Sequence, residues 1–201
     1  MTPELFLLVA TAALLELDTT YALQLTFSRG IIAGPLLGLL TGDLMAGLQV
    51  GIFTELIFSD VSPLGGILPP SAVVCCAVTL ALKALGIELY FAFFFGVLTA
   101  ILFSIAEKFM RKNRFKWLVY WEHQIMQNPN AINRTILFSL GSSFLINFIL
   151  IFLFVLICGK LMIFLVPLIP MKAHFACQFA YMAVPWIGLA TLIPTFGLKF
   201  K

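Results

Sequence analysis

Six ionisable side chains lie within or beside long apolar runs of the chain. They are Glu16, Asp18, Asp43, Glu55, Asp60 and Lys83. An ionisable group inside a membrane span costs a few kcal/mol, so each of these is a candidate functional group. Glu55 is the strongest candidate, because it follows a glycine-rich segment and precedes a stretch rich in proline and glycine. Its carboxylate could accept hydrogen bonds from sugar hydroxyls, and a charged acceptor forms bonds about twice as strong as a neutral one.

Structural roles for the same carboxylates remain open. Glu55 could pair with Lys83 or cap a helix instead of binding a ligand. Asp43 follows a glycine, so it could either satisfy backbone donors at a helix start or take part in binding. For Glu16 and Asp18 we expect an interfacial position near the end of the first span.

The sequence contains no recognisable catalytic set. Neither a Ser-His-Asp arrangement, nor a Walker loop, nor an H-E-x-x-H motif occurs, so we expect no enzyme acting alone and assign no catalytic residue. His123 and His174 are too isolated to form a metal site or to suggest a phosphohistidine, and we expect no metal and no other cofactor. The cysteines lie inside apolar runs without C-x-x-C or Cys/His spacing, which predicts small buried hydrophobic residues. They are Cys75, Cys76, Cys158 and Cys177.

The composition indicates a membrane protein. Hydrophobic residues make up 62% of the 201 positions and charged residues only 10%, against about 45–50% and about 25% in soluble domains. Since a spanning helix needs about 20 apolar residues, the length allows about six or seven spans. We predict a single all-α domain over residues 1–201, a multi-pass membrane helical bundle whose first apolar run is a retained helix rather than a cleaved signal. The predicted apolar segments are 4–25, 31–59, 71–84, 86–106, 135–158, 160–170 and 173–198.

Two features predict close-packed and broken helices within this bundle. Glycines recur at steps of four along a helix face: Gly30, Gly34, Gly38 and Gly42, then, after a gap of five, Gly47 and Gly51. A ridge of small residues lets a neighbouring helix approach closely. The stretch 62–71 contains three prolines and two glycines, so it predicts a loop or re-entrant turn at membrane depth. Broken helices of this kind often mark the substrate site of a transporter.

Positive charge is concentrated in one hydrophilic stretch. Residues 107–134 hold six of the twelve basic residues and two acidic ones, a net charge of +4, while the rest of the chain sums to −1. By the positive-inside rule we expect a cytoplasmic loop here. Trp117, Tyr120 and Trp121 alternate with its charges, as in an amphipathic helix at the lipid headgroups. Binding of nucleic acid is a much less favoured explanation, and none is expected.

The run Arg29–Leu56 resembles the IIC subunit of mannose/fructose/sorbose-family phosphotransferase systems (PTS). The arginine, Gly42–Asp43, the paired glycines and Glu55–Leu56 follow the family's order and spacing. Gly65–Ser71 resembles the family's small-residue loop ending in proline, although the family usually has aspartate at the last of these positions. The resemblance covers about residues 27–75.

The resemblance implies a multi-pass subunit of the bacterial inner membrane that binds a hexose or amino sugar and moves it across the bilayer. It also implies a IID-like membrane partner and soluble IIA and IIB proteins that carry the phosphate, and we expect an oligomer. Carried over residue by residue, Glu55 would be a sugar ligand, and Pro70 and Ser71 would belong to the binding pocket or gate. Asp43 and Thr54 are further candidate ligands.

Two other functions remain open from the sequence. Serine at position 71 and the short chain would also fit a IIC-like sensor or assembly scaffold that binds sugar without uptake. An unrelated transporter or channel could use Asp43 and Glu55 for ions or protons. Transport that follows a proton gradient and ignores the phosphotransfer proteins would identify that class.

Overall fold

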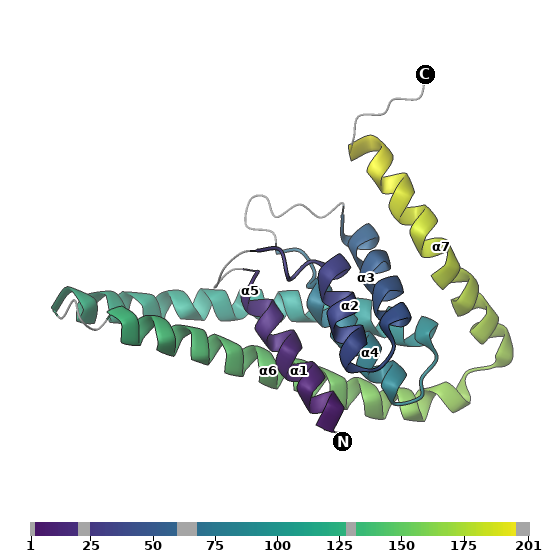
Figure 1. Ribbon diagram of the computed structural model, residues 1–201, viewed down its shortest axis with the longest axis horizontal. Helices are drawn as coiled ribbons and strands as arrows, with labels where there is room; N and C mark the ends of the chain where they lie inside the picture. Colours follow the sequence, from purple (N-terminus) through teal and green to yellow (C-terminus); the bar gives the residue numbers. More distant parts are fainter. Residues whose placement is uncertain (1–2, 20–24, 60–67, 128–131, 196–201) are drawn as a thin grey trace.

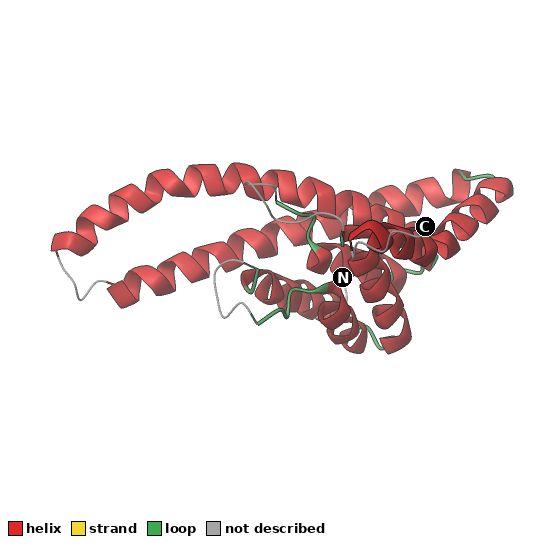
Figure 2. Cartoon of the chain, turned by 90° about the horizontal axis from the view of Figure 1, so that it is seen from above, coloured by secondary structure: helices red, strands yellow, loops and turns green. Residues whose placement is uncertain are grey.

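The structure, a computed structural model, describes residues 3–19, 25–59, 68–127 and 132–195, with side chains except at 114–127 and 191–195. Every regular element in these ranges is a helix, and Figure 2 shows no strand among the described residues. In chain order (Figure 1) they are α1 (Pro3–Leu17), α2 (Gly30–Leu40), α3 (Leu44–Phe58), α4 (Ala72–Ala84), α5 (Leu89–Gln127), α6 (Ile132–Leu165), the 3-10 turn η2 (Val166–Leu168) and α7 (Met171–Thr195). The all-α prediction is confirmed.

Two of the described helices, α5 and α6, are long and apolar enough to cross a bilayer. α5 has 39 residues, which at about 1.5 Å per residue gives about 58 Å. The hydrocarbon core of a bilayer is only about 30 Å thick. The excess length forms the far part of a hairpin with α6 that stands away from the other helices (Figure 1, left).

The stretch 107–134, which we expected to be a cytoplasmic loop containing an amphipathic helix, is mostly a continuation of the two long helices. α5 continues to Gln127 and α6 resumes at Ile132. Neither glycine nor proline occurs between Gly96 and Pro129, and lysine, arginine and glutamate are good helix formers, so nothing ends the helix earlier. The side chains of the predicted headgroup-level aromatics, Trp117, Tyr120 and Trp121, lie outside the described ones.

The glycine ridge joins α2 and α3 into a tightly packed hairpin. A Cβ added to Gly30 would come 2.7 Å from the carbonyl oxygen of Gly51, and one added to Gly38 would come 2.8 Å from the Cα of Gly47. The two backbones therefore touch directly, as the four-residue spacing predicted. Gly42 is not part of the ridge: it occupies the turn between the helices with φ +75°, a conformation that favours glycine.

The predicted apolar segment 31–59 is therefore two helices and not one. α2 and α3 contain 11 and 15 residues, or about 17 and about 23 Å of length, less than the thickness of the hydrocarbon core. The opposite correction applies near the C-terminus. The predicted segments 135–158 and 160–170 are not separated at Lys160, which is exposed on α6, a helix that continues without interruption to Leu165.

α4 is the central helix of the body. It is buried continuously from Val73 to Leu82 and contacts α1, α2, α3, α5 and α6. A helix that is apolar on every side belongs in the core of a large bundle. Cys75 and Cys76 lie on this helix and Cys158 on α6, all buried as predicted, whereas Cys177 is half-buried.

The short helices place their termini at two opposite ends of the body. At one end, which we call the Glu55 end, the C-terminal ends of α1 and α3 meet the N-terminal ends of α2 and α4. At the other, the Asp43 end, the turn between α2 and α3 lies beside the C-terminal end of α4. α7 packs against α3 and α5, with the ring of Tyr181 5.0 Å from that of Phe53 and 5.2 Å from that of Phe93.

Candidate functional site

Glu55 bridges α3 and the start of α2. Its Oε1 lies 2.7 Å from Nη1 of Arg29, and its Oε2 accepts a hydrogen bond from the backbone N–H of Gly30 at 2.9 Å. Arg29 itself provides no side-chain cap for α2, so the Glu55 carboxylate occupies the positive end of that helix. Of the alternatives left open by the sequence, Glu55 thus caps a helix, and its cationic partner is Arg29 rather than Lys83.

The Glu55 carboxylate still has room for a ligand. Its side chain is 28% exposed and that of Arg29 is 64% exposed. A carboxylate offers about four lone-pair sites, of which the described contacts use two. A half-exposed carboxylate beside an exposed guanidinium presents both an acceptor and several donors, which matches the alternating character of sugar hydroxyls.

Asp43 belongs to the opposite end of the body. Its Oδ1 accepts a hydrogen bond from the N–H of Ala46 at 2.9 Å, so it caps α3, and its Oδ2 accepts one from the ammonium of Lys83. Twelve positions of α3 separate Asp43 from Glu55, about 18 Å along the axis. The structure therefore does not bring these two predicted ligands into one site.

Thr54 faces the interior. It is fully buried, and its hydroxyl donates to Sγ of Cys75 at 3.4 Å. It therefore lies in the contact between α3 and α4, on a different side of α3 from the exposed part of Glu55. This packing favours a structural role for Thr54.

Pro70 and Ser71 lie at the Glu55 end, where α4 begins. The backbone of Leu68–Ser71 is not helical, as predicted for this part of the broken segment. Ser71 caps α4 by accepting the N–H of Val74 at 3.2 Å, and it donates its own hydroxyl to Oε2 of Glu16 at 2.6 Å. The rest of the predicted break, including Asp60, Pro63 and the glycine pair, lies outside the described residues.

Glu16 and Asp18 lie at the C-terminal end of α1, the end of the first span as expected, but they are buried inside the protein. Glu16 is only 2% exposed and Asp18 is also buried. The Asp18 carboxylate accepts the backbone N–H groups of Leu25 and Ser28, at 2.8 and 3.3 Å, and so fixes the path of the chain toward α2. The partner of Glu16 lies 55 positions away, which explains why the local sequence gave no signal for its burial.

An ion pair on α5 that we did not predict faces Glu16. Glu107 is 7% exposed and accepts hydrogen bonds from Nη2 and Nε of Arg111, at 2.6 and 3.0 Å. Both residues interact electrostatically with Glu16. Their spacing of four residues is the usual one for a pair on a helix and could have revealed the contact.

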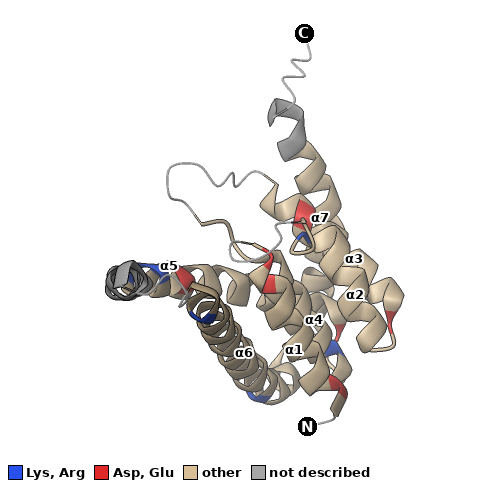
Figure 3. Cartoon of the chain, turned by 60° about the vertical axis from the view of Figure 1, so that its left-hand side comes forward, with Lys and Arg blue, Asp and Glu red and all other residues tan. Residues whose placement is uncertain are grey.

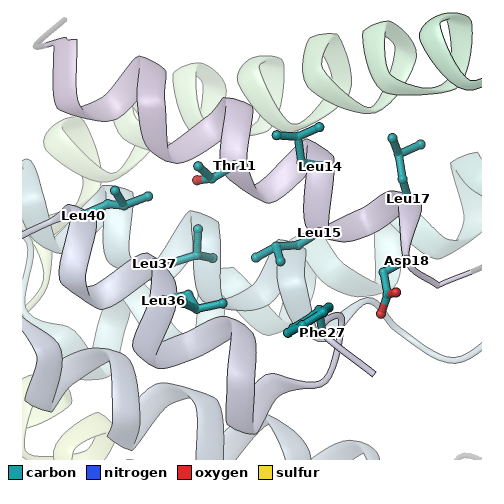
Figure 4. Close-up of a pocket in the computed structure, with 9 residues that line it drawn as sticks. All are labelled: Thr11, Leu14, Leu15, Leu17, Asp18, Phe27, Leu36, Leu37 and Leu40. Carbon is teal, nitrogen blue, oxygen red and sulfur yellow. The ribbon is translucent and has the colours of Figure 1, made fainter. Parts of the chain in front are cut away.

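A separate open groove lies between α1 and α2 (Figure 4). It has a volume of about 480 Å³, and none of the predicted sugar-binding residues lines it. Leucine and phenylalanine dominate its lining: Leu14, Leu15, Leu17, Phe27, Leu36, Leu37 and Leu40, with Thr11 and Asp18. The hydroxyl of Thr11 donates to the carbonyl of Leu8 in its own helix, so the groove offers few polar groups to a sugar.

Charged residues are sparse on the rest of the body, and Figure 3 shows mostly uncharged ribbon around α2, α3 and α4. Among the described residues no group of three or more histidine, cysteine, aspartate or glutamate side chains could hold a metal ion. His174 contacts Tyr90 instead, with Nδ1 3.1 Å from the phenolic oxygen, and thereby joins the start of α7 to the start of α5.

The fold and this polar end define an all-helical integral membrane protein with short broken helices packed beside two long ones. A solved structure described as "Structure of membrane protein" has the same fold, with a TM-score of 0.71 over 98% of this chain and 81% of that chain, at 20% identity. The family "PTS system sorbose-specific IIC component" matches residues 3–199, and the chain belongs to this family of phosphotransferase-system permease subunits.

A curated relative agrees with the family. The "Putative N-acetylgalactosamine permease IIC component 2" of Escherichia coli (strain K12) is 31% identical over 93 residues, which cover 42% of this chain and 70% of the relative. The resemblance seen in the run Arg29–Leu56 is thereby confirmed, and the class of subunit is a permease component of the membrane.

Proposed function

We propose that this chain binds a hexose or amino sugar at the Glu55 end and carries it across the bacterial inner membrane for phosphorylation by partner proteins. The observation that carries the proposal is the partly exposed Glu55 carboxylate, held between Arg29 and the start of α2 at 2.7 and 2.9 Å. Pro70 and Ser71 lie at the same end of the body and form its border. The E. coli relative makes N-acetylgalactosamine the first sugar to test.

The partners and the orientation belong to the same proposal. A IID-like membrane subunit completes the permease, soluble IIA and IIB proteins supply the phosphate, and the subunits form an oligomer. The single domain 1–201 has its basic stretch 107–134 in the cytoplasm, consistent with its net charge of +4, six basic residues against two acidic ones. Asp43 lies too far from Glu55 to share a ligand with it in this arrangement, so it is not included in the site.

The test is binding of radiolabelled N-acetylgalactosamine, mannose and sorbose to the purified protein in lipid nanodiscs, with and without a co-expressed IID-like partner. Glu55→Gln keeps the size of the side chain and removes its charge. Losing a hydrogen bond to a charged group costs about 1.5–3 kcal/mol, so the affinity should fall about 10- to 100-fold. Glu88→Gln makes the same chemical change at an exposed position of the Asp43 end and should bind as wild type.

Each outcome has a clear meaning. Saturable binding that weakens in Glu55→Gln and persists in Asp43→Asn supports the sugar site at the Glu55 end. If sugar binding is lost equally in Glu55→Gln and Asp43→Asn, either the ligand binds elsewhere or the variants are unfolded. Thermal melting of each variant distinguishes these two cases. No binding of any sugar, even with the partner present, contradicts the proposal and favours a scaffold or an ion transporter.

A further inference from the structure

A buried polar cluster joins three helices at the Glu55 end. Glu16 comes from the last turn of α1, Ser71 from the N-terminus of α4, and Glu107 and Arg111 from α5. Both carboxylates are more than nine-tenths buried. The proposed ligand site does not use Glu16, Glu107 or Arg111, so the permease function does not by itself explain why they are there.

The charges of this cluster do not balance if both carboxylates are ionised. Arg111 directs two hydrogen bonds to a single oxygen of Glu107, which makes Glu107 the ionised member. Glu16 is left with the neutral hydroxyl of Ser71. Burying a charge without an opposite charge is strongly unfavourable, and a proton on Glu16 removes the imbalance.

No other charged group near the cluster corrects the imbalance, since Arg29, the other cation of the Glu55 end, pairs with Glu55. Directly after α1, Asp18 adds a further negative charge, and its oxygens accept backbone N–H groups. The basic residue of α4, Lys83, lies at the Asp43 end. α6 carries Arg134 and Lys160, and both are exposed. Within the described residues, α5 alone therefore supplies a cation to this cluster.

One hydroxyl connects Glu16 to the border of the proposed sugar site. Ser71 donates to Glu16 at 2.6 Å and accepts from the N–H of Val74 at 3.2 Å. The position of Ser71 fixes both the first turn of α4 and the non-helical segment Leu68–Ser71 that leads into it. A change in the charge of Glu16 therefore acts directly on this segment.

We propose that Glu16 is a positioning residue that, in its protonated form, holds Ser71 and the segment Leu68–Ser71 in the arrangement that binds substrate. Loss of the proton strengthens the bond that Ser71 donates to Glu16, but it leaves two buried carboxylates beside one guanidinium. Repulsion between Glu16 and Glu107 then moves the end of α1, together with Ser71, away from α5, and the contact of α1 and α4 with α5 loosens. The inference rests on the proposed sugar site for its effect on binding. The positioning of α4 can be measured without any sugar.

The first experiment measures the pH dependence of N-acetylgalactosamine binding in nanodiscs between about pH 5 and about pH 9, the range in which buried carboxyl groups titrate. Glu16→Gln is neutral at every pH and keeps an oxygen that accepts from Ser71. Wild-type affinity should fall as the pH rises, by up to about tenfold per pH unit once the competent form becomes the minor one. The affinity of Glu16→Gln should stay at the low-pH value throughout.

The second experiment follows hydrogen exchange at the amide of Val74, corrected for the intrinsic effect of pH, in the absence of sugar. Protection should decrease at high pH in the wild type and remain constant in Glu16→Gln. Glu4→Gln, the same change at an exposed position of the same helix, should behave as the wild type in both experiments.

The two experiments separate the two proposals. If no sugar binds at any pH, the proposed function fails. The positioning of α4 by a protonated Glu16 is still supported if protection of the Val74 amide depends on pH in the wild type and not in Glu16→Gln. If Glu16→Gln retains the wild-type pH dependence of binding or of exchange, the role of Glu16 is overturned. If Glu16→Gln no longer melts cooperatively, Glu107→Gln takes its place. Glu107→Gln removes the second carboxylate of the cluster, so both sugar binding and exchange at Val74 should become independent of pH in this range.

Discussion

At the residue scale, the same carboxylates and hydroxyls that could bind a ligand also satisfy the N-terminal ends of helices. Glu55 accepts the first N–H of α2, Asp43 caps α3 and Ser71 caps α4. A capping side chain typically contributes about 1 kcal/mol. Substitutions at these positions must therefore separate a loss of binding from a loss of structure, which conservative variants that retain an acceptor can do.

Ser71→Asp tests the contact with Glu16. Aspartate caps a helix as well as serine does, so the change leaves the cap of α4 and places a second carboxylate against Glu16, where the serine hydroxyl now lies 2.6 Å away. We expect the free energy of unfolding, measured by detergent titration in mixed micelles at pH 9, where Glu16 has lost the proton that could join the two carboxyl groups, to fall by about 1–3 kcal/mol. In a Glu16→Gln background the same change should cost much less. Equal costs in the two backgrounds would show that Glu16 and Ser71 do not interact.

At the element scale, the sequence predicted those features that depend on regular spacing and missed those that depend on distant partners. The four-residue spacing of glycines predicted the close packing of α2 and α3. It also concealed the turn between them, because Gly42 keeps the spacing but adopts φ +75°. The pairing of Glu55 with Arg29, 26 positions away, and that of Lys83 with Asp43, 40 positions away, depend on how the hairpin folds. Neither can be read from local composition.

Gly34→Ala tests the packing of this hairpin. A Cβ at Gly34 would lie 2.7 Å from Cα of Gly51, and the carbonyl of Gly47 is closer still. Both neighbours are backbone, so the helices must move apart. Overpacking of this kind typically costs about 1–3 kcal/mol, and we expect a loss of stability in this range in the same unfolding assay.

Gly141→Ala is the matched control for that prediction. Gly141 lies on α6 with nothing within 4 Å of the position of its Cβ. Alanine is a better helix former than glycine by about 1 kcal/mol, so this variant should be as stable as the wild type or slightly more so. A Gly34→Ala protein that matches it in stability would mean that α2 and α3 are not in backbone contact.

At the scale of the whole molecule, the hairpin of α5 and α6 makes the protein elongated and separates its most basic part from its compact body (Figure 1). The far part of the hairpin was expected as a loop with a separate amphipathic helix, because its residues are charged. Charge reports contact with water and does not report the absence of a helix, and a stretch without glycine or proline can continue a spanning helix beyond the membrane. The positive charge of the stretch 107–134 predicts that the far part of the hairpin lies on the cytoplasmic side of the membrane.

The orientation can be measured by labelling single cysteines with a membrane-impermeant maleimide. Lys112 and Glu88 are both exposed and lie near the two ends of the candidate span of α5. They are separated by 24 positions, about 36 Å along a helix, which exceeds the about 30 Å of the hydrocarbon core. In a background with serine at Cys158 and Cys177, Lys112→Cys should react in inverted membrane vesicles and Glu88→Cys in intact spheroplasts. The reverse pattern would place the basic hairpin outside the cell. Soluble IIA and IIB proteins could not reach the hairpin there, so this result would contradict both the predicted topology and the proposed coupling to phosphorylation.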